Sequence, residues 1–181
     1  MEEDIKKVFE KLQIDTDRLL IRRIEYGDKL DLFEIMSDKE TACDDGFTPY
    51  QDMNEKYEIV FKYLVSDETH YAIESREHSK VIGIMHLTEK TERAVMCYEI
   101  GYVVNAAYRR KGYGTESVEA LIDYCFKTTN IELFTACVYD WNIKSSNMLK
   151  KLGFILEGKL HKIDRHVKFG PVDMLSFYKE R

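Results

Sequence analysis

Apolar residues recur along the chain at two spacings, and each spacing predicts a different element. A repeat of roughly three to four residues is typical of one face of a helix, whereas short apolar runs between polar turns are typical of strands. The first pattern predicts helices at about 1–13, 28–36, 57–64, 114–127 and 142–152. The second predicts strands at about 18–22, 70–75, 80–87, 93–104, 133–138, 154–160 and 172–178. Residues 37–54 are predicted to form a polar connector.

The order of these elements predicts the sheet. Strand, turn, helix and strand follow one another across residues 93–138, which is typical of two parallel strands joined by a right-handed crossover. The other strand pairs are joined by short turns and are expected to be antiparallel. We therefore expect an α/β fold with a mixed, mostly antiparallel sheet of about seven strands and helices on both faces.

Composition indicates one globular domain over residues 1–181. Hydrophobic residues make up 44% of the 181, and two prolines with nine glycines give no long flexible linker. No apolar run is long enough to cross a membrane, and the acidic start lacks the form of a signal peptide. We expect a cytoplasmic protein with no membrane partner and reduced cysteines, of which Cys97, Cys125 and Cys137 lie in apolar segments suited to a core.

Net charge argues against nucleic-acid binding, and histidine spacing argues against a metal site. The 27 Lys and Arg against 33 Asp and Glu give a formal net charge of −6, which disfavours nucleic acid as a partner and suits a cationic substrate. The five histidines show no spacing typical of metal ligands, so no metal is expected.

The strongest chemical signal is the segment Arg109-Arg110-Lys111-Gly112-Tyr113-Gly114-Thr115, between an apolar strand and an amphipathic helix. Glycines let backbone N–H groups approach a ligand, and the first N–H groups of a helix have no partner inside it. Such a turn favours a phosphate or diphosphate. The alternative is a basic surface turn at the start of a helix.

Two common phosphate motifs do not fit this turn. Position 117 is Ser, so the third glycine of a dinucleotide fold is missing, and no Gly-Lys-Thr or Gly-Lys-Ser triplet occurs. A nucleotide-phosphate enzyme is therefore disfavoured. Instead, the turn follows a strand that carries Glu99 and precedes Asn142-Ile-Lys-Ser145 and Leu152-Gly153-Phe154.

This combination resembles the GNAT superfamily of N-acetyltransferases, in particular the branch of the ribosomal-protein N-terminal acetyltransferases. Thr16-Asp17-Arg18-Leu19-Leu20-Ile21-Arg22 also matches that branch, and the resemblance covers about residues 16–178. It implies acetyl-CoA as donor, a primary amine as acceptor, and a splay between the two central parallel strands. The cofactor-binding positions that it implies are Tyr102, Val103, Val104, Arg109, Arg110, Lys111, Gly112, Tyr113, Gly114, Thr115 and Asn142.

Acetyl transfer needs a neutral amine. A lysine-like amine has a pKa of about 10.4, so its deprotonation near pH 7.4 costs roughly 4 kcal/mol, and a nearby base lowers that barrier. Family members commonly use a Glu on this strand, which makes Glu99 the candidate base. The alternative is a buried or edge carboxylate paired with a Lys or Arg.

One position departs from the family pattern. Many relatives carry a Tyr in the later helix as acid for the CoA thiolate, and counting back from Gly153-Phe154 places Leu149 there. Ser145 is the candidate replacement, with Tyr102 and Tyr139 as weaker ones. A thiolate also leaves without help, so a side-chain acid is not required.

The acceptor is not identified by the sequence. The connector lines the acceptor cleft in relatives, which makes Asp44, Asp45, Phe47 and Tyr50 candidate substrate-binding residues. A protein N-terminus and a small amine both remain open, as does a homodimer, which is common among relatives. The second hypothesis is a non-catalytic acyl-CoA-binding or regulatory module, which the missing Tyr at Leu149 keeps open.

Overall fold

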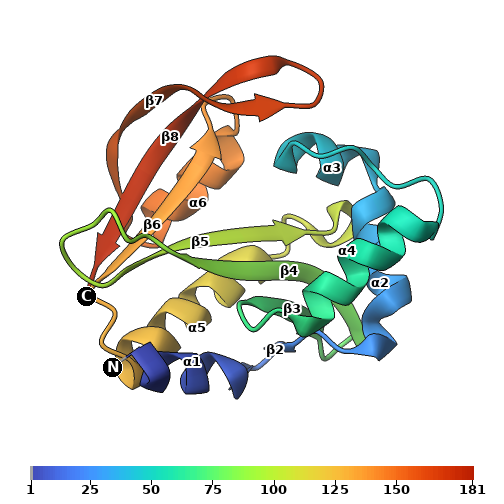
Figure 1. Ribbon diagram of the computed structural model, residues 1–181, viewed down its shortest axis with the longest axis horizontal. Helices are drawn as coiled ribbons and strands as arrows, with labels where there is room; N and C mark the ends of the chain where they lie inside the picture. The colour runs from blue at the N-terminus through green and yellow to red at the C-terminus, as the bar shows by residue number, and fades with distance from the viewer. Residues whose placement is uncertain (1) are drawn as a thin grey trace.

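The computed structural model describes the backbone of residues 2–181 and the side chains of residues 5–181. Within this range eight strands form one sheet in the order β1-β2-β3-β4-β5-β6-β8-β7 (Figure 1). The strands are β1 (Gln13–Asp15), β2 (Leu19–Arg23), β3 (His70–Ser75), β4 (Lys80–Glu89), β5 (Cys97–Val104), β6 (Leu133–Tyr139), β7 (Ile155–His166) and β8 (Gly170–Glu180). The mixed, mostly antiparallel sheet is confirmed, with one strand more than the seven expected.

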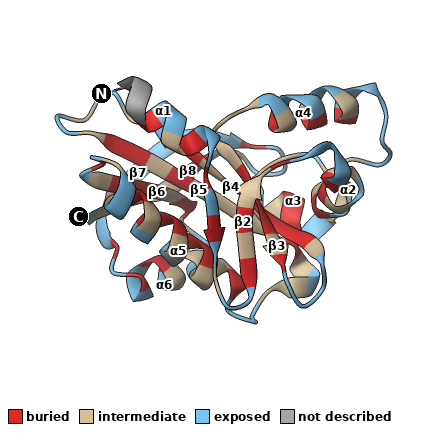
Figure 2. Cartoon of the chain, turned by 90° about the horizontal axis from the view of Figure 1, so that it is seen from below, coloured by how far each residue is buried: buried red, intermediate tan, exposed pale blue. Residues whose placement is uncertain are grey.

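Helices cover both faces of the sheet, and two apolar cores follow from this (Figures 1 and 2). On one face α1 (Glu2–Glu10), α5 (Tyr113–Thr128) and α6 (Ile143–Lys151) enclose the larger core, which includes Phe9, Leu121 and Phe134. On the other face α2 (Lys29–Ser37) and α4 (Glu55–Ser66) enclose a smaller one around Tyr57 and Phe61. Side chains alternate between the faces along each strand, so one sheet supplies both cores.

The single parallel pair, β5 and β6, separates part-way along its length. The two strands pair only at Cys97–Leu133, Tyr98–Phe134 and Glu99–Thr135. Beyond that point β5 stays paired with β4 as far as Gly83–Val104, and β6 stays paired with β8 as far as Tyr139–Met174. A gap therefore opens between the two central strands, as the resemblance implied.

Three boundaries differ from the sequence prediction. The first helix ends at Glu10, and residues 13–15 instead pair antiparallel with β2, because the sheet edge offers them hydrogen bonds. The strand expected from 93 begins at Cys97 after a turn, and the strand expected at 154–160 continues to His166 as a long hairpin with β8.

The polar connector contains a helix, α3 (Lys39–Asp45), that the apolar pattern did not indicate. Asp38 caps its start by accepting a 2.7 Å hydrogen bond from the N–H of Thr41, and Gly46, with φ of 83°, ends it. Thr41 and Ala42 are its buried residues, which is too little apolar surface to give a visible stripe.

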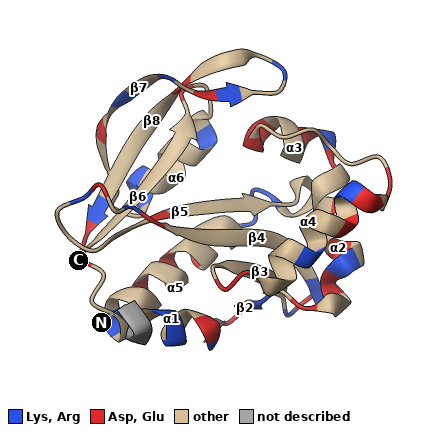
Figure 3. Ribbon diagram, viewed as in Figure 1, with Lys and Arg blue, Asp and Glu red and all other residues tan. Residues whose placement is uncertain are grey.

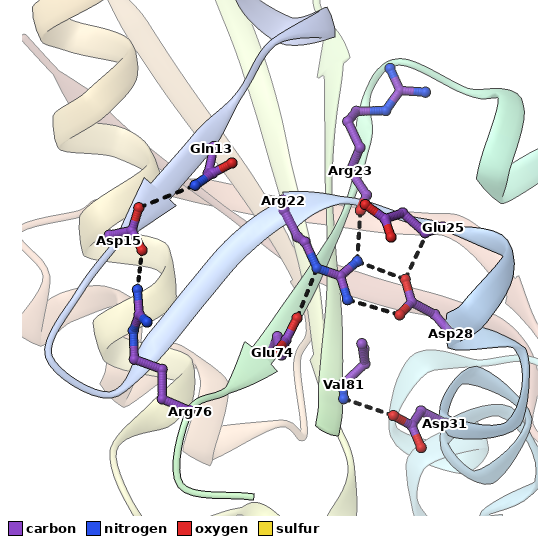
Figure 4. Close-up of polar contacts among 10 residues, drawn as sticks. All are labelled: Gln13, Asp15, Arg22, Arg23, Glu25, Asp28, Asp31, Glu74, Arg76 and Val81. Atoms are coloured by element: carbon purple, nitrogen blue, oxygen red, sulfur yellow. Dashed lines mark hydrogen bonds and ion pairs between the residues drawn. The ribbon is translucent and has the colours of Figure 1, made fainter. Parts of the chain in front are cut away.

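An ion network fixes the connection from β2 to α2 (Figure 4). The Arg22 guanidinium donates to both carboxylate oxygens of Asp28, at 2.8 and 2.9 Å, and to Glu74 at 2.8 Å. The side chains of Arg22 and Asp28 are 17% and 8% exposed. These two carboxylates raise the pKa of Arg22, with burial opposing them, so the guanidinium stays charged.

We expect Arg22→Ala to lower the free energy of unfolding by about 3 kcal/mol, because it leaves a buried carboxylate without its partner. The matched control is Arg76→Ala, since Arg76 pairs with Asp15 at the surface of the same region, and its loss is expected to cost under about 1 kcal/mol. Urea denaturation of both variants measures the difference, and equal costs would contradict the assignment.

Candidate active site

The glycine turn presents a run of unpartnered backbone donors. Arg110 and Gly112 have positive φ angles of 62° and 87°, and helix α5 begins directly afterwards at Tyr113. Within the described residues 2–181, none of the N–H groups from Arg110 to Thr115 donates to a protein acceptor, and Glu116 is the first to bond, to the carbonyl of Gly112 at 3.0 Å. The helix dipole adds partial positive charge at the same place. The turn can therefore bind an anion through its backbone.

The side chains of the turn divide into two groups. The Arg109 guanidinium donates to Asp44 at 2.6 Å, to Glu40 and Thr41 at 3.2 Å, and to the carbonyl of Val104 at 2.9 Å, so it holds α3 against β5. The side chains of Arg110 and Lys111 are exposed and have no carboxylate partner among residues 5–181. These two, rather than Arg109, are free to add positive charge around an anion.

The segment before β2 supports the turn from behind. Arg18 donates to the carbonyl of Lys111 at 2.9 Å and to Glu116 at 2.7 Å, and its guanidinium lies 4.9 Å from the centre of the Tyr113 ring. Thr16 also donates to Glu116, at 2.5 Å. These contacts give the opening motif of the sequence a physical role, because they fix the turn and neutralise the one carboxylate in the first turn of α5.

The gap between β5 and β6 is lined by free backbone groups. Alternate residues of a strand direct their N–H and C=O groups to opposite neighbours. The N–H of Leu133 bonds the carbonyl of Met96 at 3.2 Å, so the even-numbered residues of β5 face β6, and the N–H of Asn105 bonds Ile82 of β4 at 2.8 Å, which agrees. Beyond the last pair at Glu99, the backbone groups of Tyr102 and the N–H of Val104 therefore face the gap without a strand partner, while the Val104 carbonyl accepts from Arg109.

A hydroxyl pair lies on the α6 side of the gap. The Tyr102 hydroxyl and Ser145 Oγ are 2.6 Å apart, and they join β5 to the first turn of α6. Burial raises the pKa of Tyr102 to about 12, with the Ser145 hydrogen bond opposing, so the phenol stays protonated. Asn142 caps α6 by accepting from the N–H of Ser145 at 3.1 Å. Leu149 is fully buried in the larger core, where it could not act on a ligand.

Glu99 lies at the point where the two strands separate, with its side chain in a groove of about 520 Å³. Its Oε2 is 3.8 Å from Lys90 Nζ, so the paired carboxylate foreseen as the alternative is present. The groove is lined by Lys90, Glu92, Arg93, Glu99, Thr135, Cys137, Glu157, Gly158, Leu160 and Ser176. Its polar lining and size are suited to a polar or charged ligand.

Cys137 also lines this groove, which corrects its expected place in the core. Burial and the neighbouring Glu99 charge raise the pKa of its thiol to about 12. The thiol is therefore protonated at neutral pH and is a poor nucleophile. Cys97 and Cys125 are buried as expected.

The acceptor candidates of the connector lie in different surroundings. Asp44 is bound by Arg109, and Phe47 lines a pocket of about 210 Å³ between α3 and the β7–β8 turn. Asp45 is an exposed residue. Desolvation of its carboxyl and the nearby Asp44 charge nevertheless raise its pKa to about 6, against the effect of Arg109. Tyr50 packs on Tyr57, with ring centres 5.5 Å apart, and belongs to the smaller core. Acidic residues thus gather at the end of α3 near the hairpin (Figure 3).

The sequence did not single out His86, which lies near Glu99. It is on β4, opposite Gly101 of β5, and no motif surrounds it. Only the pairing of β4 with β5 places its ring close to the gap.

Two features are absent from the described part of the chain. No helix there is long and apolar enough to span a membrane. No group of three or more His, Cys, Asp or Glu side chains in residues 5–181 is arranged to hold a metal ion.

Comparisons with known proteins agree with this geometry. The profile described as "Acetyltransferase (GNAT) domain" matches residues 18–155. The protein named uncharacterized N-acetyltransferase YnaD of Bacillus subtilis is 30% identical over 149 residues, which cover 81% of this chain and 85% of YnaD.

Two solved structures share the fold. Ribosomal-protein-S5-alanine acetyltransferase from Vibrio fischeri has a TM-score of 0.77 and 20% identity, covering 94% of this chain and 97% of the other. Spermidine N-acetyltransferase from Vibrio cholerae, in complex with CoA and spermine, has a TM-score of 0.75 and 19% identity, covering 91% and 96%.

Proposed function

The chain belongs to the GNAT acetyltransferase family, and on that premise we propose that it moves an acetyl group from acetyl-CoA to a primary amine by direct attack in a ternary complex. The observation that carries the proposal is the run of N–H groups from Arg110 to Thr115 without protein acceptors, next to the open edge of β5. A diphosphate with an amide-bearing arm is the kind of ligand that both features suit.

The residues of the turn and the gap fit acetyl-CoA. The N–H groups of the turn, with the exposed side chains of Arg110 and Lys111, would hold the diphosphate. The backbone of Tyr102 and the N–H of Val104 would pair with the pantetheine amides as a neighbouring strand does, since the Val104 carbonyl is bound by Arg109. Val103 lies between these two residues, and Asn142 would meet the arm at the start of α6. Bound acetyl-CoA supplies the acetyl group as a thioester. A backbone N–H at the gap would polarise its carbonyl.

The groove supports direct attack rather than an acetyl-cysteine intermediate. Cys137 is the thiol that faces the groove, and its raised pKa keeps it protonated. Glu99 places a carboxylate where the strands separate, and this charge attracts a cationic amine. Glu99 also remains a candidate to receive the proton that the amine must lose.

The Tyr102–Ser145 hydroxyl pair is proposed as the acid for the departing CoA thiolate. It bridges β5 and α6 at 2.6 Å beside the gap, and its phenol is protonated at neutral pH. The pair would replace the Tyr that relatives carry at the position of Leu149, which is part of the core here.

A cationic amine is the proposed acceptor class. Asp44 and Asp45 lie at the end of α3, and three glutamates, Glu92, Glu99 and Glu157, line the groove. Asp44 is paired with Arg109, Glu157 with Arg93, and both Glu92 and Glu99 with the single Lys90, so the carboxylates of the groove outnumber its cations. The two enzymes of known structure that share the fold are named for a ribosomal-protein alanine and for spermidine. A polyamine and a protein N-terminus are therefore the two acceptors to test first.

The test is CoA release by the purified protein with polyamines, aminoglycosides, amino sugars and peptides that have free N-termini. Turnover with at least one primary amine, and none with the N-acetylated form of that amine, is expected. Tight acetyl-CoA binding without turnover on any amine would instead favour the non-catalytic acyl-CoA-binding module.

Gly114→Val is expected to weaken acetyl-CoA binding at least about tenfold, or roughly 1.4 kcal/mol, with the fold retained. A Cβ at Gly114 would meet Met148 and Val104 at ordinary contact distances of 3.5 and 3.6 Å, so the fold has room for it while the branched side chain crowds the turn. Gly27→Val is the control, because a Cβ there meets nothing within 4 Å. Titration calorimetry measures the acetyl-CoA affinity of both variants. An unchanged affinity in the Gly114 variant would argue against diphosphate binding by the N–H groups of the turn.

Tyr102→Phe and Ser145→Ala are each expected to lower kcat by about tenfold or more while acetyl-CoA affinity stays within about twofold, because the pair acts after binding. The double variant should be little worse than either single one, since the two hydroxyls act as a unit. Ser66→Ala, an exposed hydroxyl on α4, is the control. An unchanged kcat in both single variants would remove the pair from the mechanism.

A further inference from the structure

The imidazole of His86 occupies the space above Gly101. The two residues are cross-strand partners on β4 and β5, and a Cβ built at position 101 would overlap Cε1 and Nε2 of the His86 ring. A side chain other than hydrogen at position 101 would displace the ring, so the glycine is needed for it to lie there. Gly101 is two residues beyond Glu99, on the part of β5 that has already left β6. The ring therefore covers β5 next to the open gap.

A second histidine and an aspartate support His86 from the side away from the gap. The His70 ring on β3 stacks on His86, with centres 5.3 Å apart and planes inclined by 26°. His70 Nδ1 lies 2.8 Å from Asp67 Oδ1, and the Tyr63 ring of α4 packs on His70 at 5.7 Å. Burial works against the charge on Asp67, but hydrogen bonds from His70 and Thr69 hold its pKa below the ordinary value. Asp67 is therefore a fixed negative charge behind the two rings.

We propose that His86 is a catalytic base of the acetyl transfer, and that Glu99 holds the incoming ammonium rather than taking its proton. This inference rests on the proposed function. As the amine nitrogen bonds to the acetyl carbon, the carbon–sulfur bond breaks and its electron pair stays on sulfur. Before the attack the ammonium gives one proton to Nε2 of His86, which passes it to solvent and so frees the nitrogen lone pair. The second proton, which the nitrogen loses once it is bonded to carbon, leaves by the same route, and the sulfur takes a proton from the Tyr102–Ser145 pair, which is refilled from solvent.

The surroundings favour His86 over Glu99 for this step. The Glu99 carboxylate already faces Lys90 at 3.8 Å, and its charge acts on the neighbouring Cys137, whose thiol pKa it raises. Burial and the neighbouring His70 lower the pKa of His86, while the charges of Glu99 and Asp67 oppose them. The imidazole is thus neutral at neutral pH and can accept a proton, and the same two carboxylates stabilise the imidazolium that forms.

The test is the pH profile of kcat with saturating amine and acetyl-CoA. The wild-type rate should fall as the pH drops through the pKa of His86, below about 6.5, because the imidazolium cannot accept a proton. His86→Gln is expected to lower kcat about 100-fold and to remove this acid limb, with acetyl-CoA affinity within about twofold. Added imidazole should restore part of the rate to His86→Ala. A profile and kcat unchanged in His86→Gln would overturn the proposal.

Two neighbouring variants distinguish His86 from Glu99 as the base. Glu99→Gln should move the acid limb to lower pH, since the Glu99 charge raises the pKa of His86, and His70→Gln should move it to higher pH. If Glu99 is the base, Glu99→Gln removes the limb while His86→Gln keeps it, and the proposal fails.

Gly101→Ala tests the geometry without changing a titrating group. The added methyl overlaps the ring, so its kcat and pH profile should resemble those of His86→Gln, whereas a wild-type profile would count against the proposal. His161→Gln is the control, because the His161 side chain is 76% exposed on the hairpin. A titration of the His86 ring by NMR reports its pKa without turnover, and a value above 6.5 would contradict the argument. Failure of the wild type to acetylate any amine would refute the proposed function instead.

Discussion

The separation of β5 from β6 after the Glu99–Thr135 pair is the constraint on which the site depends. Each strand remains held by its outer neighbour, β4 or β8, so the sheet stays continuous while the inner edges of the two strands lose their partners. Buried backbone groups need hydrogen bonds, and at this edge the Arg109 side chain supplies one, to the carbonyl of Val104. The opening between the two strands lies next to the N–H groups of the turn, where Gly114 approaches Val104.

Side chains alternate between the two faces of β5, so the proposed acid and the proposed base lie on opposite faces of the sheet. Tyr102 extends toward α6, where it meets Ser145, whereas Glu99 and the glycine beneath His86 belong to the opposite face. A carbonyl held at the edge of this strand would lie between the two. An amine would approach from the groove, and the thiolate would depart toward the hydroxyl pair. In the proposed mechanism, the alternation of one strand thus places the two proton transfers on opposite faces.

Helix α3 connects the two sides of the gap. Arg109 ties it to the glycine turn and to the carbonyl of Val104 on β5. His166 on β7 ties it to the other side through a 2.8 Å contact with the carbonyl of Cys43. At its end, Gly46 leaves room for the Tyr139 hydroxyl at the end of β6. Helix α3 is thus held both by Arg109, at the start of the glycine turn, and by the β7–β8 hairpin.

The sequence by itself determined the class of fold, the parallel pair with its crossover helix, and the glycine turn, because apolar period and glycine placement act over short stretches of chain. It placed Glu99 in the strand before the glycine turn and Ser145 in the helix that follows Asn142, and the structure has both residues in those elements. It did not predict α3, a short polar helix that depends on its cap and on its contacts with Arg109. Nor could it show that Arg109 binds that helix, that Cys137 lines the groove, or that the His86 ring lies over Gly101. Those relations join residues that are far apart in the chain, and strand register and side-chain direction decide them only once the sheet is assembled.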